Sequence, residues 1–335
     1  MTLFTLANHT SGLPRLPDNL KPKDVENPYA DHTVEQLYSF LSNYSPTREI
    51  GAKYEYSNLG VGLLGHILSL KASRDYETLV ITRIAQPLGM DSTRIQLSPE
   101  MQERFATGHN QSGKVVKNWD IPTLAGAGAL RSTANDLLKF LAANLGFTQS
   151  TLFPAMQTAY SNLKSTDIPD LKIGLGWHVL TKYGTEIISH NGGTGGYRSF
   201  IGFDPKQKTG VVVVSNSANE VDDLGLHLLN QNYKLVKHTP PKQRQAIALN
   251  PKIYDAYIGQ YQLAPNFILT ITKENDKLYA QATNQPKVEL FPEAEIQFFI
   301  KDVDAQITFV KDKQGQVTHL ILHQAGQSLE AKKIQ

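Results

Sequence analysis

The sequence predicts a mixed α/β fold in the broad sense, of the α+β class. A mainly helical half and an antiparallel sheet flanked by helices come first, and a small C-terminal all-β barrel follows. Three observations predict this fold. Capped segments with apolar residues at helical spacing extend to Gly146, short β-branched runs follow as far as Ser217, and alternating runs separated by turn residues recur beyond Pro251. The spacing of the apolar residues therefore changes twice along the chain.

Length and composition are those expected of two domains. The chain has 335 residues, of which 40% are hydrophobic and 19% charged, an ordinary globular composition with enough residues for a large core. A segment rich in proline and basic residues begins at Lys237 and has the character of a linker. We expect one domain over residues 1–236, a linker over 237–250 and a barrel domain over 251–335.

Charge and cysteine content narrow the possible functions. The net charge is only +2 and no block of like charge occurs, so we expect no nucleic-acid partner. The absence of cysteine excludes disulfides, thiolate nucleophiles and thiolate metal sites. We find neither a signal-peptide pattern after Met1 nor a run of about 18 apolar residues that could span a membrane. Compartment and oligomeric state stay open.

The first elements follow from prolines and helix caps. Residues 2–12 predict a short helix or turn, and the four prolines within 13–30 predict a loop. Thr33 then caps a helix, because Gln36 three residues later completes a capping box. The apolar residues of this helix recur at helical spacing and predict a buried stripe.

Tyr56-Ser57-Asn58 stands where a turn enters an apolar helix, which we expect from about Leu59 to Lys71. If this tripeptide caps the helix, the Tyr56 phenol and the Asn58 carboxamide stand clear of it at its positive end. A tyrosine there can act as general acid or base once positive neighbours lower its pKa from about 10, and an amide beside it can hold a substrate carbonyl. The alternative is an ordinary helix cap beside a packed tyrosine.

Glycines within that helix allow two interpretations. Gly60, Gly62 and Gly65 match the dinucleotide-binding pattern Gly-x-Gly-x-x-Gly. That pattern requires a hydrophobic strand before it and, after it, a second strand ending in an acid. Here the lead-in is polar and another helix, Asp75–Ala85, follows. Glycines that let helices approach closely are the better explanation.

The middle of the chain is expected to pass from helix to sheet. Lys114–Pro122 predicts a short strand with Trp119 as an apolar anchor, and Ser132 or Thr133 begins a helix that stops at Gly146. Four short runs then predict an antiparallel meander. These runs are Ile173–Leu180, Glu186–His190, Tyr197–Asp204 and Gly210–Ser217.

A last helix and an apolar strand complete the first domain. Val211–Val214 is apolar throughout, which predicts a strand covered on both faces. The helix Asp223–Val236 places Leu224, Leu228 and Leu235 on one side, which we expect to cover the sheet.

Beyond the linker, short alternating runs predict an up-and-down β-barrel or sandwich. The predicted strands are Phe267–Thr272, Lys277–Ala282, Val288–Phe291, Gln297–Ile300, Gln306–Val310 and Val317–His323. Turn signals such as Glu274-Asn275-Asp276 and Lys313-Gln314-Gly315 separate them. No catalytic constellation stands out in this part.

Four motifs in fixed order carry a family resemblance. They are His9-Thr10-Ser11-Gly12-Leu13-Pro14, Tyr56-Ser57-Asn58, the small-residue run from Gly126 to Thr133, and His190-Asn191-Gly192 followed by further glycines. In this order they resemble the serine β-lactamase and penicillin-binding-protein-like hydrolases, in the branch of class C β-lactamases, D-alanyl carboxypeptidases and esterases. Tyr56-Ser57-Asn58 matches that family's Tyr-x-Asn element and His190-Asn191-Gly192 its Lys-Thr-Gly or His-x-Gly element. The C-terminal part resembles the lipocalin-like barrel of some relatives.

One motif of this family is not found at its expected place in the sequence. The family's nucleophile is the serine of a Ser-x-x-Lys turn upstream of the His-Thr-Ser-Gly stretch, where this chain has Met1. The string Ser161-Asn162-Leu163-Lys164 lies out of order, between Tyr56 and His190, and we interpret it as a chance match. We therefore expect a truncated chain that is inactive by itself, with an exposed sheet edge that makes it melt early. Relatives are commonly periplasmic or exported.

What the resemblance implies is acyl transfer through a serine ester. Tyr56 would shuttle the proton and Asn58 would orient the substrate amide. His190, Asn191 and Gly192 would form an edge strand facing the substrate, and the Gly193 amide would be one oxyanion donor. With Gly195 and Gly196, these glycines would keep that strand clear of obstructing side chains.

His190 replaces the lysine of the Lys-Thr-Gly form. A histidine is mostly neutral at pH 7, so we expect peptides, esters or amides to be preferred to β-lactams. Arg198 could restore the lost charge, and a solvated arginine on a strand is the alternative. No His-Glu-x-x-His or Gly-x-Ser-x-Gly pattern supports a metal site or an α/β-hydrolase triad, and we expect no cofactor.

Two hypotheses on function remain. The chain is part of a serine hydrolase acting on a small-molecule or peptide substrate, or it is a non-catalytic remnant that binds peptides in the same groove. Retention of Tyr56, Asn58 and the glycine-rich strand favours the hydrolase.

Overall fold

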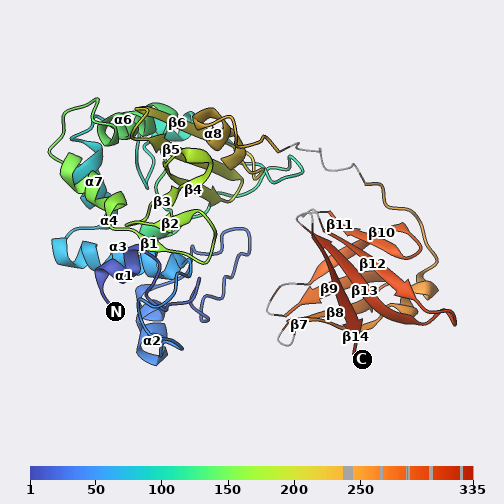
Figure 1. Ribbon diagram of the computed structural model, residues 1–335. Helices are drawn as coiled ribbons and strands as arrows, with labels where there is room; N and C mark the ends of the chain where they lie inside the picture. The colour runs from blue at the N-terminus through green and yellow to red at the C-terminus, as the bar shows by residue number, and fades with distance from the viewer. Residues whose placement is uncertain are drawn as a thin grey trace. The chain divides into compact units, whose positions relative to one another are not determined.

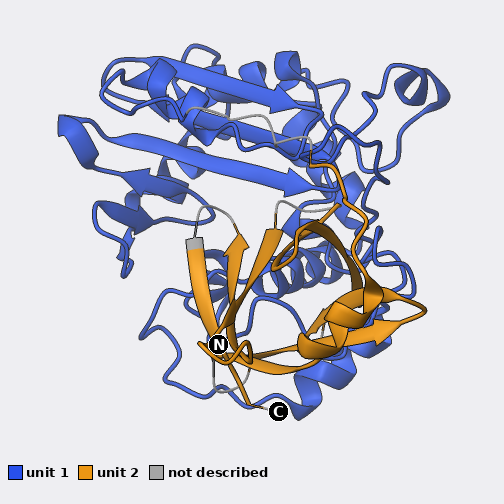
Figure 2. Cartoon of the chain, turned by 90° about the vertical axis from the view of Figure 1, so that its right-hand side faces the viewer, with its two compact units in different colours: residues 1–237 blue, residues 238–335 orange. Residues whose placement is uncertain are grey.

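The computed structural model describes residues 1–236, 244–264, 267–283, 285, 287–301, 305–324 and 327–334 (Figure 1). The chain divides into two compact units, Met1–Lys237 and His238–Gln335 (Figure 2). Of the predicted linker, residues 237–243 lie outside the described residues, and 244–250 form neither helix nor strand. No helix of the described part is both long and apolar enough to cross a membrane.

The helical half of the first unit follows the predicted caps. Thr33 forms the capping box with Gln36, Ser57 caps the long helix, and Thr133 caps the helix before Gly146. The helices are α1 (Leu3–Ala7), α2 (Val34–Asn43), α3 (Asn58–Ala72), α4 (Tyr76–Val80), η1 (Ile81–Ala85), α5 (Pro99–Glu103), η2 (Ala125–Ala127), α6 (Ala134–Asn144) and α7 (Phe153–Ser161). Residues 13–30 form a loop, as their prolines predict.

The glycines of α3 serve close packing, as expected. A Cβ added at Gly62 would lie 2.7 Å from the Leu124 Cβ, and one at Gly65 would lie 3.0 Å from the Gly126 Cα. The short helix η2 therefore lies directly against α3. Because the glycines face packed side chains and backbone, the dinucleotide interpretation has no support in the fold.

One predicted helix and one predicted strand need correction, and one helix was not predicted. The segment predicted as one helix over Asp75–Ala85 changes at Ile81 into a π-helical turn, closed by a 2.8 Å bond from the Gln86 N–H to the Ile81 carbonyl. Lys114–Pro122 forms no strand and contributes only an isolated bridge between Val115 and His109. Helix α7 was missed, although Phe153, Met156 and Tyr160 recur at helical spacing; no side-chain cap marks its start.

The first unit contains a six-stranded antiparallel meander (Figure 1). Its strands, in spatial order, are β1 (Lys164–Ser165), β2 (Leu171–Ile173), β3 (His178–Leu180), β4 (Ile187–Thr194), β5 (Tyr197–Asp204) and β6 (Thr209–Ser215). The run predicted as one strand over Ile173–Leu180 is a hairpin, because Gly176 adopts the left-handed φ of 81° and reverses the chain.

Helices cover both faces of this sheet. On one face Leu141 of α6 and Leu145, which directly follows this helix, pack against Ile188 and Phe203. On the other face the helix α8 (Asp222–Leu229) packs through Leu229 on a cluster that contains Phe200 and Ile187. Val214 of β6 is 51% exposed, so the expectation of a strand covered throughout was wrong at that position.

The predicted leucine face of α8 was also wrong. Leu224, Leu228 and Leu235 are 40%, 67% and 50% exposed. The sheet-facing position is Gly225, where an added Cβ would lie 2.0 Å from the Phe200 ring. Because that ring occupies the place of a side chain, the helix approaches the sheet on its glycine and turns Leu224 and Leu228 outward. The helix also ends at Leu229 and does not extend to Val236 as predicted, so Leu235 lies beyond it.

The second unit is a closed eight-stranded barrel, as predicted. Its strands are β7 (Gly259–Ala264), β8 (Phe267–Glu274), β9 (Lys277–Ala282), β10 (Val288–Ala294), β11 (Gln297–Ile300), β12 (Ala305–Lys311), β13 (Val317–Gln324) and β14 (Gln327–Lys333). Strand β14 pairs with β7 and closes the ring. The aromatic side chains of Tyr257, Tyr261, Phe298 and Phe309 are fully buried in its core.

Candidate active site

The segment from His9 to Arg15 holds the turn that carries Tyr56. His9 adopts a left-handed φ of 57° and its Nδ1 accepts a 3.0 Å hydrogen bond from the Ser57 N–H. The Ser57 hydroxyl donates to the Pro14 carbonyl at 2.7 Å, and the Leu59 N–H donates to the Arg15 carbonyl at 3.1 Å. The His-Thr-Ser-Gly motif is thus a support that fixes the start of α3.

Tyr56 and Asn58 flank the cap of α3. The Ser57 hydroxyl accepts from the Gly60 N–H at 2.8 Å, which leaves the side chains on either side of Ser57 free of capping. The half-buried Tyr56 ring stacks on the His9 ring with centroids 4.4 Å apart. Asn58 donates from Nδ2 to the Tyr29 hydroxyl at 3.2 Å. Both side chains border one cleft.

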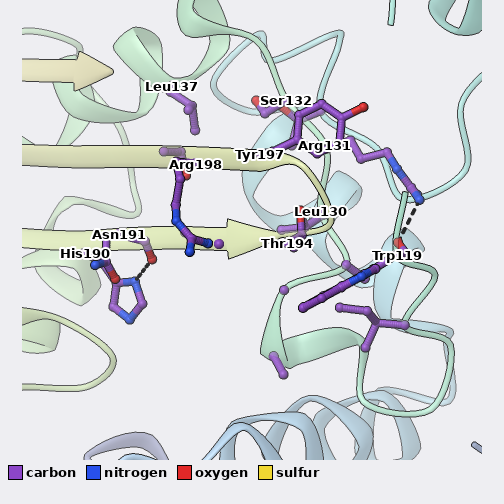
Figure 3. A pocket seen from close by; sticks show the side chains of 18 of the residues that line it. Trp119, Leu130, Arg131, Ser132, Leu137, His190, Asn191, Thr194, Tyr197 and Arg198 are labelled. Atoms are coloured by element: carbon purple, nitrogen blue, oxygen red, sulfur yellow. Dashed lines mark hydrogen bonds between the residues drawn. The ribbon is translucent and has the colours of Figure 1, made fainter. Parts of the chain in front are cut away.

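This cleft has a volume of about 870 Å³ and lies between the helical half and the sheet. It is lined by every predicted site residue, namely Tyr56, Asn58, His190, Asn191, Gly192 and Gly193. Residues from near the start of the chain and from β4 therefore meet there, with the Tyr56 and His190 rings 6.4 Å apart. Figure 3 shows His190 and Asn191 on β4 beside the cleft.

The part of β4 in the cleft has strand neighbours on one side only. Pairing with β3 ends at His178 and Ser189, whereas pairing with β5 continues to Thr194. In the described sheet, residues 190–194 therefore have an edge that no strand covers. Gly193 is exposed there. An uncovered edge with glycines can receive an extended chain as an added strand.

The four glycines of this region differ in their surroundings. A Cβ at Gly192 or Gly193 would meet only the ends of the Ser199 and Arg198 side chains. A Cβ at Gly195 would lie 2.3 Å from the Lys117 carbonyl oxygen, and one at Gly196 would lie 2.6 Å from the His109 nitrogen. The expectation that all four keep the groove clear is therefore corrected, because the last two pack against the 108–119 loop.

Three imidazoles near the cleft are held neutral. The His178 and His190 rings are parallel with centroids 5.2 Å apart. Burial, aided by repulsion from the other two histidines, lowers the pKa of His9 to about 4. Burial and His190 lower the pKa of His178 to about 4, and burial also lowers the pKa of His190. His190 is thus neutral at pH 7, as its ordinary chemistry predicts.

The tautomer of His190 follows from its hydrogen bond. Its Nδ1 donates to the Asn191 carbonyl at 2.6 Å, and a carbonyl can only accept (Figure 3). The proton of the neutral ring is therefore on Nδ1, and Nε2 carries a lone pair. Asn191 itself donates from Nδ2 to Asp222 at 2.5 Å.

The pKa of Tyr56 differs from the prediction. Burial raises the pKa of Tyr56, and the guanidinium of Arg15, 5.3 Å from the ring centroid, opposes this rise without overcoming it. The expected lowering by positive neighbours was therefore wrong. At neutral pH the phenol is protonated and is a hydrogen-bond donor.

Arg198 does not replace the lost lysine charge. Its Nε forms an ion pair with Glu220 at 2.9 Å. Figure 3 shows its side chain extending from β5 across β4. The residues that sequence reasoning missed are Arg15, which directly follows the first motif, and His178, which has no motif signal because only strand pairing places it beside His190.

Ser161 lies outside the cleft. It ends α7 and donates its hydroxyl to the Thr158 carbonyl at 3.3 Å. The neighbouring Lys164 belongs to β1, and neither residue lines the cleft. Within the described residues no three His, Asp or Glu side chains are grouped to hold a metal ion.

The helical half, the antiparallel sheet and a Tyr-x-Asn turn facing a glycine-lined strand together define a protein of the serine β-lactamase and penicillin-binding-protein-like class. The chain belongs to the Beta-lactamase family, whose model matches residues 1–232. Residues 243–335 match a domain of unknown function, DUF3471.

Curated relatives and solved structures agree with this assignment. The chain is 27% identical to Penicillin-binding protein 4* of Bacillus subtilis (strain 168), over 99% of this chain and 78% of that protein. It is 29% identical to the D-alanyl-D-alanine-carboxypeptidase/endopeptidase AmpH of Escherichia coli (strain K12), over 64% of this chain and 58% of that protein. The alignments thus span about three fifths to three quarters of these relatives.

Solved structures share the fold of the first unit. A class C β-lactamase superposes with a TM-score of 0.60 at 22% identity, over 71% of this chain and 70% of that chain. The β-lactamase/D-alanine carboxypeptidase from Pseudomonas syringae gives 0.60 at 19% identity, over 70% and 72%. Because the sequence identities are this low, the similarity to these solved structures shows the fold alone.

Proposed function

We propose that this chain forms the substrate groove and the proton-transferring phenol of a serine acyl-transfer site of the peptidase, esterase or β-lactamase type. The observation that carries the proposal is that Tyr56 and the uncovered edge of β4 border the same cleft. Membership in the Beta-lactamase family supports it. The name of the relative AmpH suggests peptides that end in D-alanyl-D-alanine as substrates.

In the proposed reaction a serine hydroxyl attacks the substrate carbonyl and a covalent ester forms. The substrate lies along residues 190–194 as an added strand, with Asn58 holding its amide and the Gly193 N–H donating to the oxyanion. Tyr56 accepts the serine proton and passes it to the leaving group as the bond from that group to the acyl carbon breaks.

The same phenol cannot accept the serine proton without help. Burial keeps the pKa of Tyr56 above its ordinary value, and Arg15 alone does not compensate. A second cation close to the hydroxyl would be required, and the lysine of a Ser-x-x-Lys turn is such a cation. The proposal therefore requires a Ser-x-x-Lys segment beside this cleft for turnover.

A peptide-binding role without catalysis is the second candidate. The observation that favours it is that Ser161-Asn162-Leu163-Lys164, the one Ser-x-x-Lys string of the sequence, lies away from the cleft. Inspection of the nucleotides that precede the Met1 codon for an in-frame Ser-x-x-Lys distinguishes the two candidates.

The groove is tested by calorimetric titration with an acetylated D-alanyl-D-alanine peptide. We expect Gly193→Val to weaken binding at least about tenfold, because a branched side chain obstructs the open strand edge. Tyr56→Phe serves as the control and should leave the affinity within about twofold, since it keeps the ring and removes only the proton donor. If the unmodified chain fails to bind the peptide, or Gly193→Val binds it equally well, the groove is not the substrate site.

We expect none of the serines that line the cleft, Ser132, Ser199 and Ser215, to act as a nucleophile, and labelling tests this. We expect neither a fluorescent penicillin nor a fluorophosphonate to label the 335-residue chain, because Ser161 lies outside the cleft. Gel fluorescence followed by peptide mass mapping measures this. Label on Ser161 would show that the Ser-x-x-Lys string is functional after all, and label on a serine of the cleft would identify another nucleophile.

A further inference from the structure

Three guanidinium groups line the cleft, and two of them are already engaged. Arg131 donates to the Trp119 carbonyl at 3.1 Å (Figure 3). It also forms an ion pair with Asp120 at 3.0 Å. The Nε of Arg198 is paired with Glu220 at 2.9 Å. Neither arginine offers its full charge to an anion in the cleft.

Arg15 differs from these two. It is exposed, lines the cleft and occurs in none of the ion pairs between described residues. Its contact is with the Tyr56 ring, whose centroid lies 5.3 Å from the guanidinium carbon. The backbone beside it is fixed by the bonds from Ser57 to Pro14 and from Leu59 to Arg15. Its position at the cleft is therefore set while its charge stays available.

Apart from the three arginines, no described residue that lines the cleft supplies a positive charge at neutral pH. His178 has a pKa of about 4, and the pKa of His190 is also lowered by burial. The lining residues of the cleft include no lysine. Among the described residues that line the cleft, Arg15 is thus the cation without an acidic partner.

We propose that Arg15 recognises a carboxylate of the substrate and makes the groove selective for anionic peptides. This inference rests on the proposed function, because it assumes that the ligand lies in the groove between Tyr56 and β4. A guanidinium matches a carboxylate with two parallel N–H donors, and stacking on an aromatic ring leaves those donors free. Arg15 takes the charged role that the sequence suggested for Arg198.

The experiment uses the full chain and three acetylated peptides of equal length, titrated by calorimetry. One has a free C-terminal carboxylate, one is the C-terminal amide, and one is an amide with a glutamate side chain. We expect at least one carboxylate peptide to bind about tenfold more tightly than the neutral amide. The two carboxylate peptides identify whether a terminal or a side-chain carboxylate is recognised.

Arg15→Gln should abolish this preference and leave the affinity for the neutral amide unchanged. Arg198→Gln is the matched control and should retain the preference, since its charge is already paired. The preference should also stay the same from pH 7 to pH 9, because a guanidinium is charged over this whole range. It should weaken in high salt.

The outcomes separate this inference from the proposed function. If all three peptides bind with equal affinity, or if Arg15→Gln keeps the preference, Arg15 is not the carboxylate-binding residue although the groove still binds peptides. If none of the three binds to the unmodified chain, the proposed function fails and Arg15 has no substrate to recognise.

Discussion

The first unit is expected to lose stability steeply as the pH falls from about 6.5 to 4. His9 is 2% exposed and its pKa in the folded chain is about 4. The unfolded chain, with an ordinary histidine pKa near 6.5, binds more protons throughout this window, so each decrease in pH favours unfolding. The full pKa shift of His9 corresponds to a loss of about 3 kcal/mol in the free energy of unfolding. Protonation of His178 lowers the stability in the same direction.

The measurement is urea unfolding followed by tryptophan fluorescence at several pH values. Both tryptophans of the chain, Trp119 and Trp177, belong to the first unit, so the signal excludes the barrel. His9→Asn should flatten the pH dependence, because asparagine tolerates the left-handed conformation and its Oδ1 can accept the Ser57 N–H. His66→Asn, outside the cluster, controls for the loss of one imidazole. Equal pH profiles for the original chain and His9→Asn would contradict the prediction.

Gly196→Ala is expected to destabilise the first unit by roughly 2 to 5 kcal/mol, through left-handed strain and steric overlap. Gly196 has a φ of 74°, and an added Cβ would lie 2.6 Å from the His109 nitrogen and 2.6 Å from the Val116 Cγ2. The His109 N–H also donates to the Gly196 carbonyl at 3.2 Å, so the two segments cannot separate without losing this bond. The free energy of unfolding in urea, again from tryptophan fluorescence, measures the change.

Gly193→Ala is the matched control for that substitution. Its added Cβ would meet the Arg198 guanidinium, the mobile end of a long side chain, rather than backbone. We expect Gly193→Ala to lower the free energy of unfolding by about 1 kcal/mol or less. Equal destabilisation by the two substitutions would show that Gly196 has no special packing role.

Local chemistry made much of the fold predictable. The capping box at Thr33 and the cap at Thr133 can be recognised from residues only a few positions apart. Both helices begin where these caps predict. Strands β9 and β11 have the predicted bounds, and the turn Asn275-Asp276 marks the start of β9. The leucines of α8 gave a wrong face, because the Phe200 ring that fills the space over Gly225 comes from a distant strand.

That the predicted residues line one cleft could be inferred from the sequence, whereas the electrostatics of the cleft could not, and the roles of these residues stay predictions. Tyr56, Asn58 and His190 stand in motifs whose order alone indicates a common cleft. Whether the Tyr56 pKa rises or falls depends on burial and on the distance to Arg15, which no motif records. The pairing of Arg198 with Glu220 likewise follows from how the chain folds around the cleft.

The sequence by itself determined the family, the two structural classes of the chain and the motif residues Tyr56, Asn58 and 190–193 that line the cleft, because caps, turns and motifs act over short stretches. The tertiary structure alone decided the open edge of β4, the neutrality of the three histidines and the availability of Arg15. These properties depend on burial and on pairwise distances between residues far apart in the chain. Such quantities exist only once the polypeptide has folded.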